Sequence, residues 1–221
     1  MNTNTDPALM TYQPQFMYVD PHFYDVVKGD VEAWKDPGEM IAQPAASIVE
    51  QFLILENRLV DSGRFEEWLD LFTVDCLYWV PTVTADVDPT TQLCTAFDDR
   101  RRLEDRIVRL RTGTAYSQVP PSRTCRTISN LEIWESETPG EIRVRCAVVI
   151  HEWRVGEMRV IPGWYGYVLR KSSGPGAELS KRSELRVVRK QVDLVQADVP
   201  LRNMTFVISG GSKKWPTNHR G

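Results

Sequence analysis

Residues 141–153 read EIRVRCAVVIHEW, and apolar and mostly polar positions alternate along them. Strict alternation places successive side chains on opposite faces of an extended strand, so one face points inward and the other outward. The expected inward set is Ile142, Val144, Cys146, Val148 and Ile150, and the outward set is Arg143, Arg145, Ala147, Val149 and His151. The stretch therefore predicts a long strand of a sheet with one buried face.

Further strands are expected on both sides of it. Segments rich in β-branched and aromatic residues occur between turn-forming breaks such as Thr138-Pro139-Gly140 and Ser172–Gly176. The predicted strands are Cys76–Val83, Arg126–Trp134, Gly163–Arg170, Ser183–Gln196 and Arg202–Ser209.

Three helices are expected ahead of most of these strands. Ser47 and Glu50 form the pattern of a capping box, which predicts a helix start, and Asp61-Ser62-Gly63 predicts its end. Apolar residues at helical spacing predict a short second helix over 65–72 and a third over 98–111, with Gly113 at its stop. Helices followed by a run of long strands indicate an α+β fold, with helices packed on one face of a curved antiparallel or mixed sheet.

The chain is divided into one domain and two flanking segments. With 221 residues it has room for a single substantial core, expected over 45–209, and a polar tail is expected over 210–221. Residues 1–44 carry five prolines and no sustained periodicity, which predicts an extended arm. The arm also holds six aromatic residues, so we expect it to lie on another surface, and a free leader is the alternative: Tyr12, Phe16, Tyr18, Phe23, Tyr24 and Trp34.

Composition excludes several classes of protein. The formal net charge of −3 argues against a general nucleic-acid binder, which needs a basic surface. No apolar run approaches the ~20 residues that cross a bilayer, and Met1–Asp6 does not begin like a secretory signal. The sequence therefore predicts a cytoplasmic protein.

Cysteines and histidines are scattered. Cys76, Cys94, Cys125 and Cys146 form no C-x-x-C pair, which predicts reduced, structural thiols. None of the three histidines (His22, His151 and His219) lies two residues after a cysteine, as a Rieske cluster would require. We expect no metal, no cofactor and no catalytic residue in this chain.

The most unusual stretch, 97–130, reads FDDRRRLEDRIVRLRTGTAYSQVPPSRTCRTISN. Eight arginines stand against four acids between Asp98 and Arg126. Arginine is favoured at protein interfaces, although pairs such as Asp98–Arg102 and Asp105–Arg109 at i, i+4 also suit a solvated face, and an anion or nucleic-acid site is a third alternative. The segment Pro120-Pro121-Ser122-Arg123 is either a rigid connector that presents Arg123 or the lead-in to the next strand.

An independent enzyme of this fold would need an acid/base pair. His151 with Asp75, Tyr78 or Tyr116 is the best combination available, and a structural histidine is the more common outcome. No phosphate-binding loop or nucleophile elbow is present.

The chain resembles the beta subunits of Rieske-type aromatic-ring-hydroxylating dioxygenases. The resemblance rests on IVEQFLILENRLVD (48–61), GRFEEW (63–68), LYWVP (77–81) and the order F-D-D, R-L-x-T-G, P-P-S-R-T and S-N within 97–130. Asn203–Ile208 is similar to the family's last strand. The N-terminal arm and the glycine-rich insertion near Ser172–Ala177 depart from the family pattern.

The resemblance implies a cystatin-like cone, also called nuclear-transport-factor-like, in a hexamer of three alpha and three beta chains. In that family the alpha subunit carries a two-iron two-sulfur Rieske cluster and a mononuclear iron, supplied with electrons from NADH through a separate reductase, and the beta subunit is mainly structural. A stand-alone cone-fold isomerase or dehydratase is the alternative, and a ligand-binding or adaptor domain is a third possibility. The residues expected at subunit interfaces are Tyr78, Trp79, Arg101, Arg102, Arg106, Arg109, Pro120, Pro121, Ser122, Arg123 and Phe206.

Overall fold

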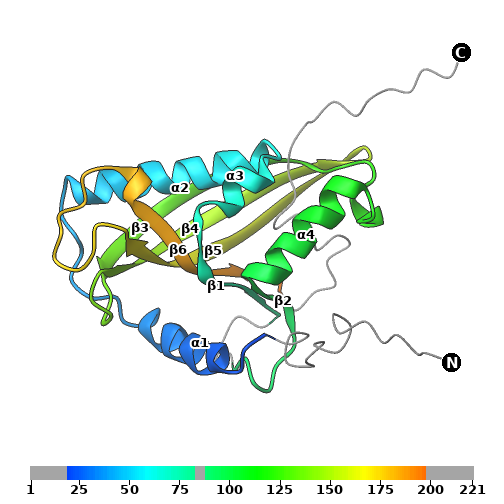
Figure 1. Cartoon of the computed structure of the whole chain (residues 1–221). Helices are drawn as coiled ribbons and strands as arrows, with labels where there is room; N and C mark the ends of the chain where they lie inside the picture. The colour runs from blue at the N-terminus through cyan, green and yellow to red at the C-terminus, as the bar shows by residue number, and fades with distance from the viewer. Residues whose placement is uncertain (1–18, 83–87, 198–221) are drawn as a thin grey trace, which may run out of the picture.

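The computed structural model describes residues 19–82 and 88–197, and it confirms an α+β cone built on a mixed sheet (Figure 1). The six strands lie in the order β2-β1-β6-β5-β4-β3, and only the β1–β6 pair is parallel. Their bounds are β1 Phe72–Pro81, β2 Cys94–Asp99, β3 Arg123–Glu135, β4 Glu141–Arg154, β5 Glu157–Lys171 and β6 Leu185–Leu194.

Strands β3, β4 and β5 are longer than predicted, whereas β6 is shorter than the strand predicted over 183–196. The strand predicted over 163–170 begins at Glu157, because Val155 and Gly156 both adopt positive φ and close a tight two-residue hairpin between β4 and β5. Strand β2 was not predicted, and it occupies residues partly assigned to the third helix. Residues 202–209 lie outside the described residues.

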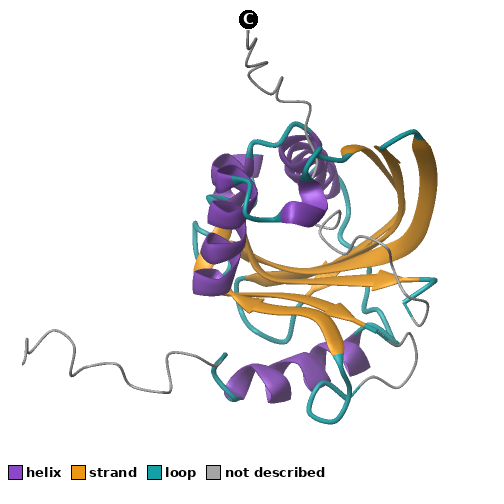
Figure 2. Ribbon diagram, turned by 90° about the vertical axis from the view of Figure 1, so that its right-hand side faces the viewer, coloured by secondary structure: helices purple, strands orange, loops and turns teal. Residues whose placement is uncertain are grey.

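Three helices cover the inner face of the sheet (Figure 2). They are α2 (Ala45–Asp61), α3 (Phe65–Leu69) and α4 (Arg100–Thr112). Their apolar sides join the inward residues of β4, including Val144, Val148 and Ile150, in one large core cluster. The predicted alternation of β4 is confirmed over this stretch, because its inward side chains are buried.

The capping box predicted at Ser47 is wrong. Helix α2 begins two residues earlier, at Ala45, and the Ser47 amide donates a hydrogen bond to the Gln43 side-chain oxygen at 3.2 Å. The predicted stop of the third helix is confirmed, since Gly113 adopts φ 74°, a left-handed conformation that suits glycine. Asp99 caps the start of α4 by accepting a hydrogen bond from the Arg102 amide at 2.9 Å.

The prediction that residues 1–44 are extended is wrong for their second half. Helix α1 (His22–Ala33) packs on the outer face of the sheet, opposite the other helices. Phe23 and Val27 bury against Leu77 and Trp79, so this part of the arm belongs to the core. Tyr12, Phe16, Tyr18 and the polar tail over 210–221 lie outside the described residues.

Trp34, which follows α1, packs against Gly166 of β5. A Cβ atom at Gly166 would come within 2.9 Å of the Trp34 ring, so this position requires a residue without a side chain. The Trp34 indole also donates a hydrogen bond to the side-chain oxygen of Gln191 at 2.9 Å. Within the described residues, no helix is both long and apolar enough to cross a membrane.

Candidate functional site

The arginine-rich helix α4 is organised around one buried carboxylate. Asp98 is 1% exposed, and its two oxygens accept hydrogen bonds from the Nε atoms of Arg102 (3.0 Å) and Arg106 (2.9 Å). A buried carboxylate without such partners would be costly. The predicted Asp98–Arg102 pair is thus confirmed, and Arg102 and Arg106 neutralise a charge of their own chain.

The remaining arginines of α4 differ in how firmly they are held. Arg100 donates to the backbone oxygens of Leu69 and Phe72 at 2.9 and 3.1 Å, which ties α4 to the end of α3. Arg101 is exposed and lies 3.8 Å from Asp99. Arg109 is exposed too, and it contacts the backbone oxygen of Asp105, in place of the side-chain pair predicted there. Arg101 and Arg109 are therefore the members of this helix best placed to meet another protein.

The connector Pro120–Arg123 joins α4 to the sheet. Ser122 is buried, and its hydroxyl donates to the buried Glu152 carboxylate at 2.5 Å. Pro120 is exposed, and its backbone oxygen accepts a hydrogen bond from Arg154 at 3.2 Å. The connector is thus fastened to β4, and Arg123 projects from it with its guanidinium 5.7 Å from the centre of the Trp153 ring.

Next to the connector lies an exposed apolar surface that was not predicted. The β4–β5 hairpin ends in Trp153, Val155 and Met158, which are 37%, 69% and 62% exposed, and Tyr116 is 82% exposed. We call these four residues together with Arg123 the connector end. Its signal in the sequence was the apolar residues Trp153, Val155 and Met158 around the break between the two predicted strands. Large exposed apolar residues that gather in one place mark interaction surfaces.

Three predicted interface residues are covered by their own chain. Tyr78 points into the core and is 0% exposed, and Trp79 packs beneath α1. Ser122 is buried as described above. Alternation along β1 sends Tyr78 and Trp79 to opposite faces, and helices cover both faces at that point. Pro121 is half-buried, and Phe206 lies outside the described residues.

The interior of the cone is filled by a polar network. The Lys190 ammonium lies 2.7 Å from Glu56 Oε1, and Glu56 also accepts hydrogen bonds from Trp68 (2.5 Å) and Tyr167 (3.2 Å). The ammonium lies 4.2 Å from the centre of the Tyr165 ring, within the range of a cation–π contact. All five side chains are at most 3% exposed.

Burial shifts the pKa values of the phenols and of the amine in this network so that their neutral forms are favoured. Loss of hydration lowers the pKa of Lys190, although the neighbouring Glu56 opposes the shift. The same loss raises the pKa of the Tyr78, Tyr165 and Tyr167 hydroxyls. Burial also raises the pKa of Cys146 to about 12, as expected for a structural thiol. The network is therefore a buried polar core within the described residues.

The acid/base pair that an independent enzyme would need does not assemble. His151 is exposed on the outer face of β4, whereas Tyr78 is buried on the inner face of β1. Asp75 pairs with Arg170 at 3.1 Å, and Tyr116 projects from the connector end. These groups lie on different faces, so they do not form a common site.

The described side chains do not offer a ligand set for iron. Among residues 19–82 and 88–197, no three His, Cys, Asp or Glu side chains are grouped so that they could hold a metal ion. His22 is exposed on α1 beside Asp20, far from His151 in the chain, and His219 lies outside these residues. A Rieske cluster or a facial iron triad requires such a group.

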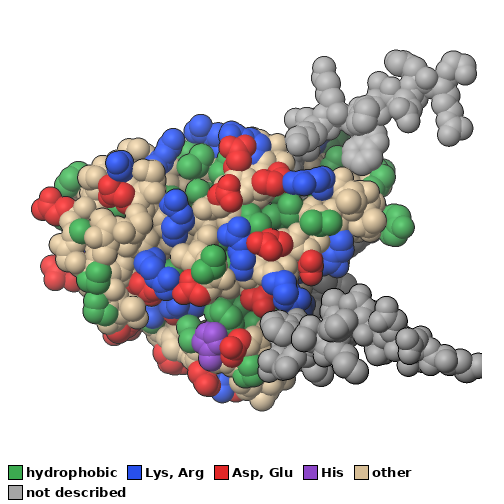
Figure 3. Space-filling view, in the orientation of Figure 1, with side chains coloured by type: hydrophobic (Ala, Val, Ile, Leu, Met, Phe, Trp, Pro, Cys, Tyr) green, Lys and Arg blue, Asp and Glu red, His purple; other side chains and the backbone are tan. Residues whose placement is uncertain are grey.

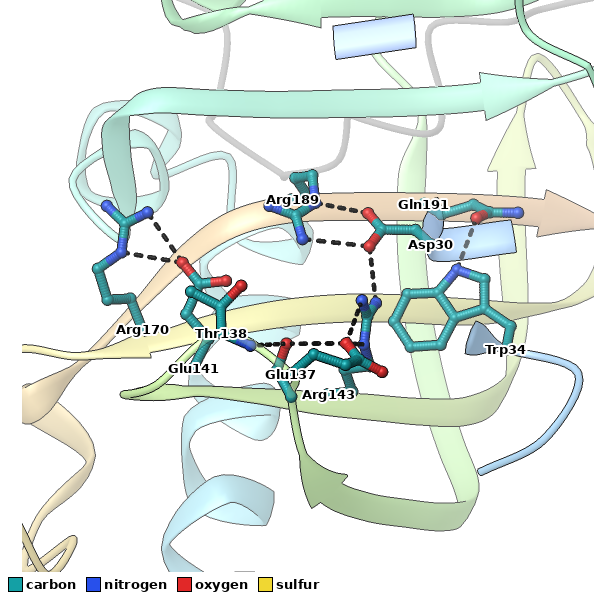
Figure 4. Close-up of polar contacts among 10 residues, drawn as sticks. Asp30, Trp34, Glu137, Thr138, Glu141, Arg143, Arg170, Arg189 and Gln191 are labelled. Atoms are coloured by element: carbon teal, nitrogen blue, oxygen red, sulfur yellow. Dashed lines mark hydrogen bonds and ion pairs between the residues drawn. The ribbon is translucent and has the colours of Figure 1, made fainter. Parts of the chain in front are cut away.

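Helix α1 is fixed to the sheet by a buried clamp (Figure 4). Asp30 is 4% exposed and accepts hydrogen bonds from Arg143 at 2.6 Å and from Arg189 at 2.5 Å. Arg143 lies over the Trp34 ring and also pairs with Glu137 at 3.0 Å. Two strands and one helix therefore meet at a single carboxylate.

Charges on the surface are interleaved. In the face seen in Figure 3, basic and acidic side chains alternate without forming a single basic patch. Such a surface suits contacts with another protein better than contacts with a phosphate backbone.

Comparison with known proteins identifies the family. Residues 55–197 match the family model described as ring hydroxylating beta subunit. The small oxygenase component of the p-cumate 2,3-dioxygenase system of Pseudomonas putida is 35% identical over 149 residues, which cover 66% of this chain and 76% of that relative. The beta subunit of biphenyl 2,3-dioxygenase of Rhodococcus jostii is 31% identical over 147 residues, which cover 62% of this chain and 79% of that relative.

Solved structures agree on the fold. The benzoate 1,2-dioxygenase beta subunit from Burkholderia mallei superposes with a TM-score of 0.55 at 23% identity, covering 75% of this chain and 99% of that one. A chain of naphthalene 1,2-dioxygenase with indole bound superposes with a TM-score of 0.65 at 16% identity, covering 86% and 100%. The protein therefore belongs to the family of ring-hydroxylating dioxygenase beta subunits.

Proposed function

We propose that this chain is the structural beta subunit of an oxygenase that adds dioxygen to an aromatic compound, and that it holds catalytic alpha subunits in fixed positions. The observation that carries the proposal is the packed interior. The place where a cone-shaped enzyme would need a pocket is filled by the Glu56–Lys190 network. The chain thus has the family's fold and a core built for stability.

The assembly we propose contains three alpha and three beta chains. The alpha subunit would carry the Rieske cluster and the mononuclear iron, and a separate reductase would supply electrons from NADH. The relatives support an aromatic substrate, since their names include p-cumate and biphenyl dioxygenases. Location in the cytoplasm remains a prediction.

The connector end and the exposed arginines of α4 are proposed as the surface that meets neighbouring chains. Arg123 is held over Trp153. Arg101 and Arg109 make only long contacts within their own chain, at 3.8 and 3.4 Å. Aromatic and arginine side chains dominate the binding energy of protein interfaces. Pro120 and Pro121, which precede Arg123, and Arg102 and Arg106, which hold Asp98, are proposed as part of the same surface.

An acidic substitution at the connector end is expected to disrupt assembly. Trp153→Asp replaces an exposed ring by a charge, and loss of one such anchor costs about 2–4 kcal/mol of binding, or roughly 30-fold or more in affinity. The measurement is light scattering of this chain co-expressed with its alpha partner. We expect wild-type complexes with a mass near three of each chain, and mostly dissociated chains for the variant.

Val74→Asp provides the matched control. Val74 is 86% exposed on β1 and lies outside the connector end, so the same apolar-to-acidic change there should leave the complex intact. If the complexes stayed intact with Trp153→Asp, the subunit contacts would have to lie elsewhere on this chain. Failure of the wild-type chain to associate with any alpha subunit would refute the proposed function itself.

A further inference from the structure

A cavity of about 370 Å³ opens beside the first turn of α2, at the opposite ends of the strands from the connector end. Sites for small molecules commonly occupy about 300–1,000 Å³. The cavity is lined by Ile41, Ala42, Gln43, Pro44, Ala45, Val49, Glu135, Ile142, Lys171, Gly176, Ala177, Glu178 and Leu179.

The walls come from two segments that the family motifs do not include. Residues 41–44 belong to the arm that precedes the family-like region, and Ala45 is the first residue of α2. Residues 176–179 cover the end of the glycine-rich insertion and the two residues after it. The subunit role proposed above uses neither of them. The first is fastened to β3, because the Ile41 amide donates to the Ile133 oxygen at 2.8 Å. At the start of the insertion, the Ser172 amide donates to the Glu184 oxygen of the 3-10 helix η4 (Arg182–Glu184) at 2.7 Å.

The floor of the cavity is apolar. Val49, Ile142 and Leu179 are at most 9% exposed, and Ala45 and Ala177 continue the apolar lining toward the rim. An apolar floor favours a ligand with a hydrocarbon body, because contact with it removes apolar surface from water.

One cation faces the cavity from a nearly covered position. The Lys171 side chain is 12% exposed, and its ammonium lies 3.1 Å from Glu135, whose side chain is 60% exposed. A pair with so exposed a carboxylate is weak, so another carboxylate can displace Glu135 into water at little cost. The N-terminal end of the 17-residue helix α2 adds a positive potential from the same side. Glu178 is the opposing charge at the rim.

We propose that this cavity binds a small organic monocarboxylate. The apolar body of the ligand lies on Val49, Ile142 and Leu179, and its carboxylate takes the place of Glu135 beside Lys171. The inference is independent of the subunit role, since it concerns residues at the other end of the sheet.

The test is a calorimetric titration of the full-length chain with cyclohexanecarboxylate, cyclohexylmethanol and cyclohexylmethylamine, which share one ring and differ in charge. We expect the carboxylate to bind at one site per chain and more tightly than the other two. Lys171→Met should weaken it about tenfold, because a charge-assisted hydrogen bond is lost. Glu135→Gln should tighten it severalfold by removing the competing carboxylate.

Two tryptophan variants separate cavity binding from binding elsewhere. Ala177→Trp fills the cavity and should abolish binding, whereas Ser173→Trp, on the same loop but outside the lining, should leave it unchanged. The proposal is overturned if the carboxylate does not bind at about 10 mM, a concentration that would saturate even a weak site. It is equally overturned if the alcohol binds as tightly, if Glu135→Gln does not tighten binding, or if Ala177→Trp retains it.

Discussion

Replacing Glu56 by leucine is expected to destabilise the protein by about 3–5 kcal/mol, because it leaves a buried charge without its partner. The Lys190 ammonium is 3% exposed and lies 2.7 Å from Glu56. The same substitution removes the acceptor of the Trp68 indole and the Tyr167 hydroxyl. The free energy of unfolding, measured by urea denaturation, tests this expectation.

The double variant Glu56→Leu/Lys190→Met is the control. It removes both charges together, and apolar replacement of a buried ion pair is often neutral or stabilising. We therefore expect it to recover most of the loss. A double variant less stable than Glu56→Leu would show that the destabilisation does not arise from the orphaned ammonium.

Asp30→Ala is expected to cost about 3 kcal/mol and to loosen α1 from the sheet, since Arg143 and Arg189 lose a shared carboxylate. Both guanidiniums are largely covered, so water cannot fully replace it. Lys28 and Lys35 lie in and just after α1. The rate at which trypsin cleaves at these two lysines reports the release of the helix, and it should rise severalfold.

Asp25→Ala offers a matched comparison on the same helix. Asp25 is exposed and takes no part in the clamp, so this change should leave trypsin cleavage and stability nearly unaltered. Equal cleavage of the Asp25 and Asp30 variants would mean that α1 is held by its apolar contacts alone.

Short sequence patterns predicted the elements that depend only on residues close together in the chain. The alternation over 141–153 identified β4, and Gly113 marked the end of α4, because each depends on the residue's own backbone geometry. Helix α1 was missed because prolines flank it at Pro21 and Pro37 and because one of its buried residues is the charged Asp30. Its inward face therefore lacked a continuous apolar stripe.

The polar interior could not be predicted, because its partners are distant in sequence. Glu56 and Lys190 are separated by 134 residues, and Asp30 and Arg189 by 159. Each looks like an ordinary surface charge until the fold brings its partner within reach. The arginines of α4 add a second case, since Arg102 and Arg106, which are predicted at an interface, also neutralise the buried Asp98 of their own chain.

We propose that this chain provides structure and that its partner provides the redox chemistry. The most direct test measures iron and aromatic-ring hydroxylation for the purified chain alone and for the complex co-expressed with its alpha partner. We expect iron and activity in the complex, unchanged by His151→Ala in this chain, and neither in the chain alone. Stoichiometric iron bound by the isolated chain, or ring hydroxylation without the partner, would contradict the account.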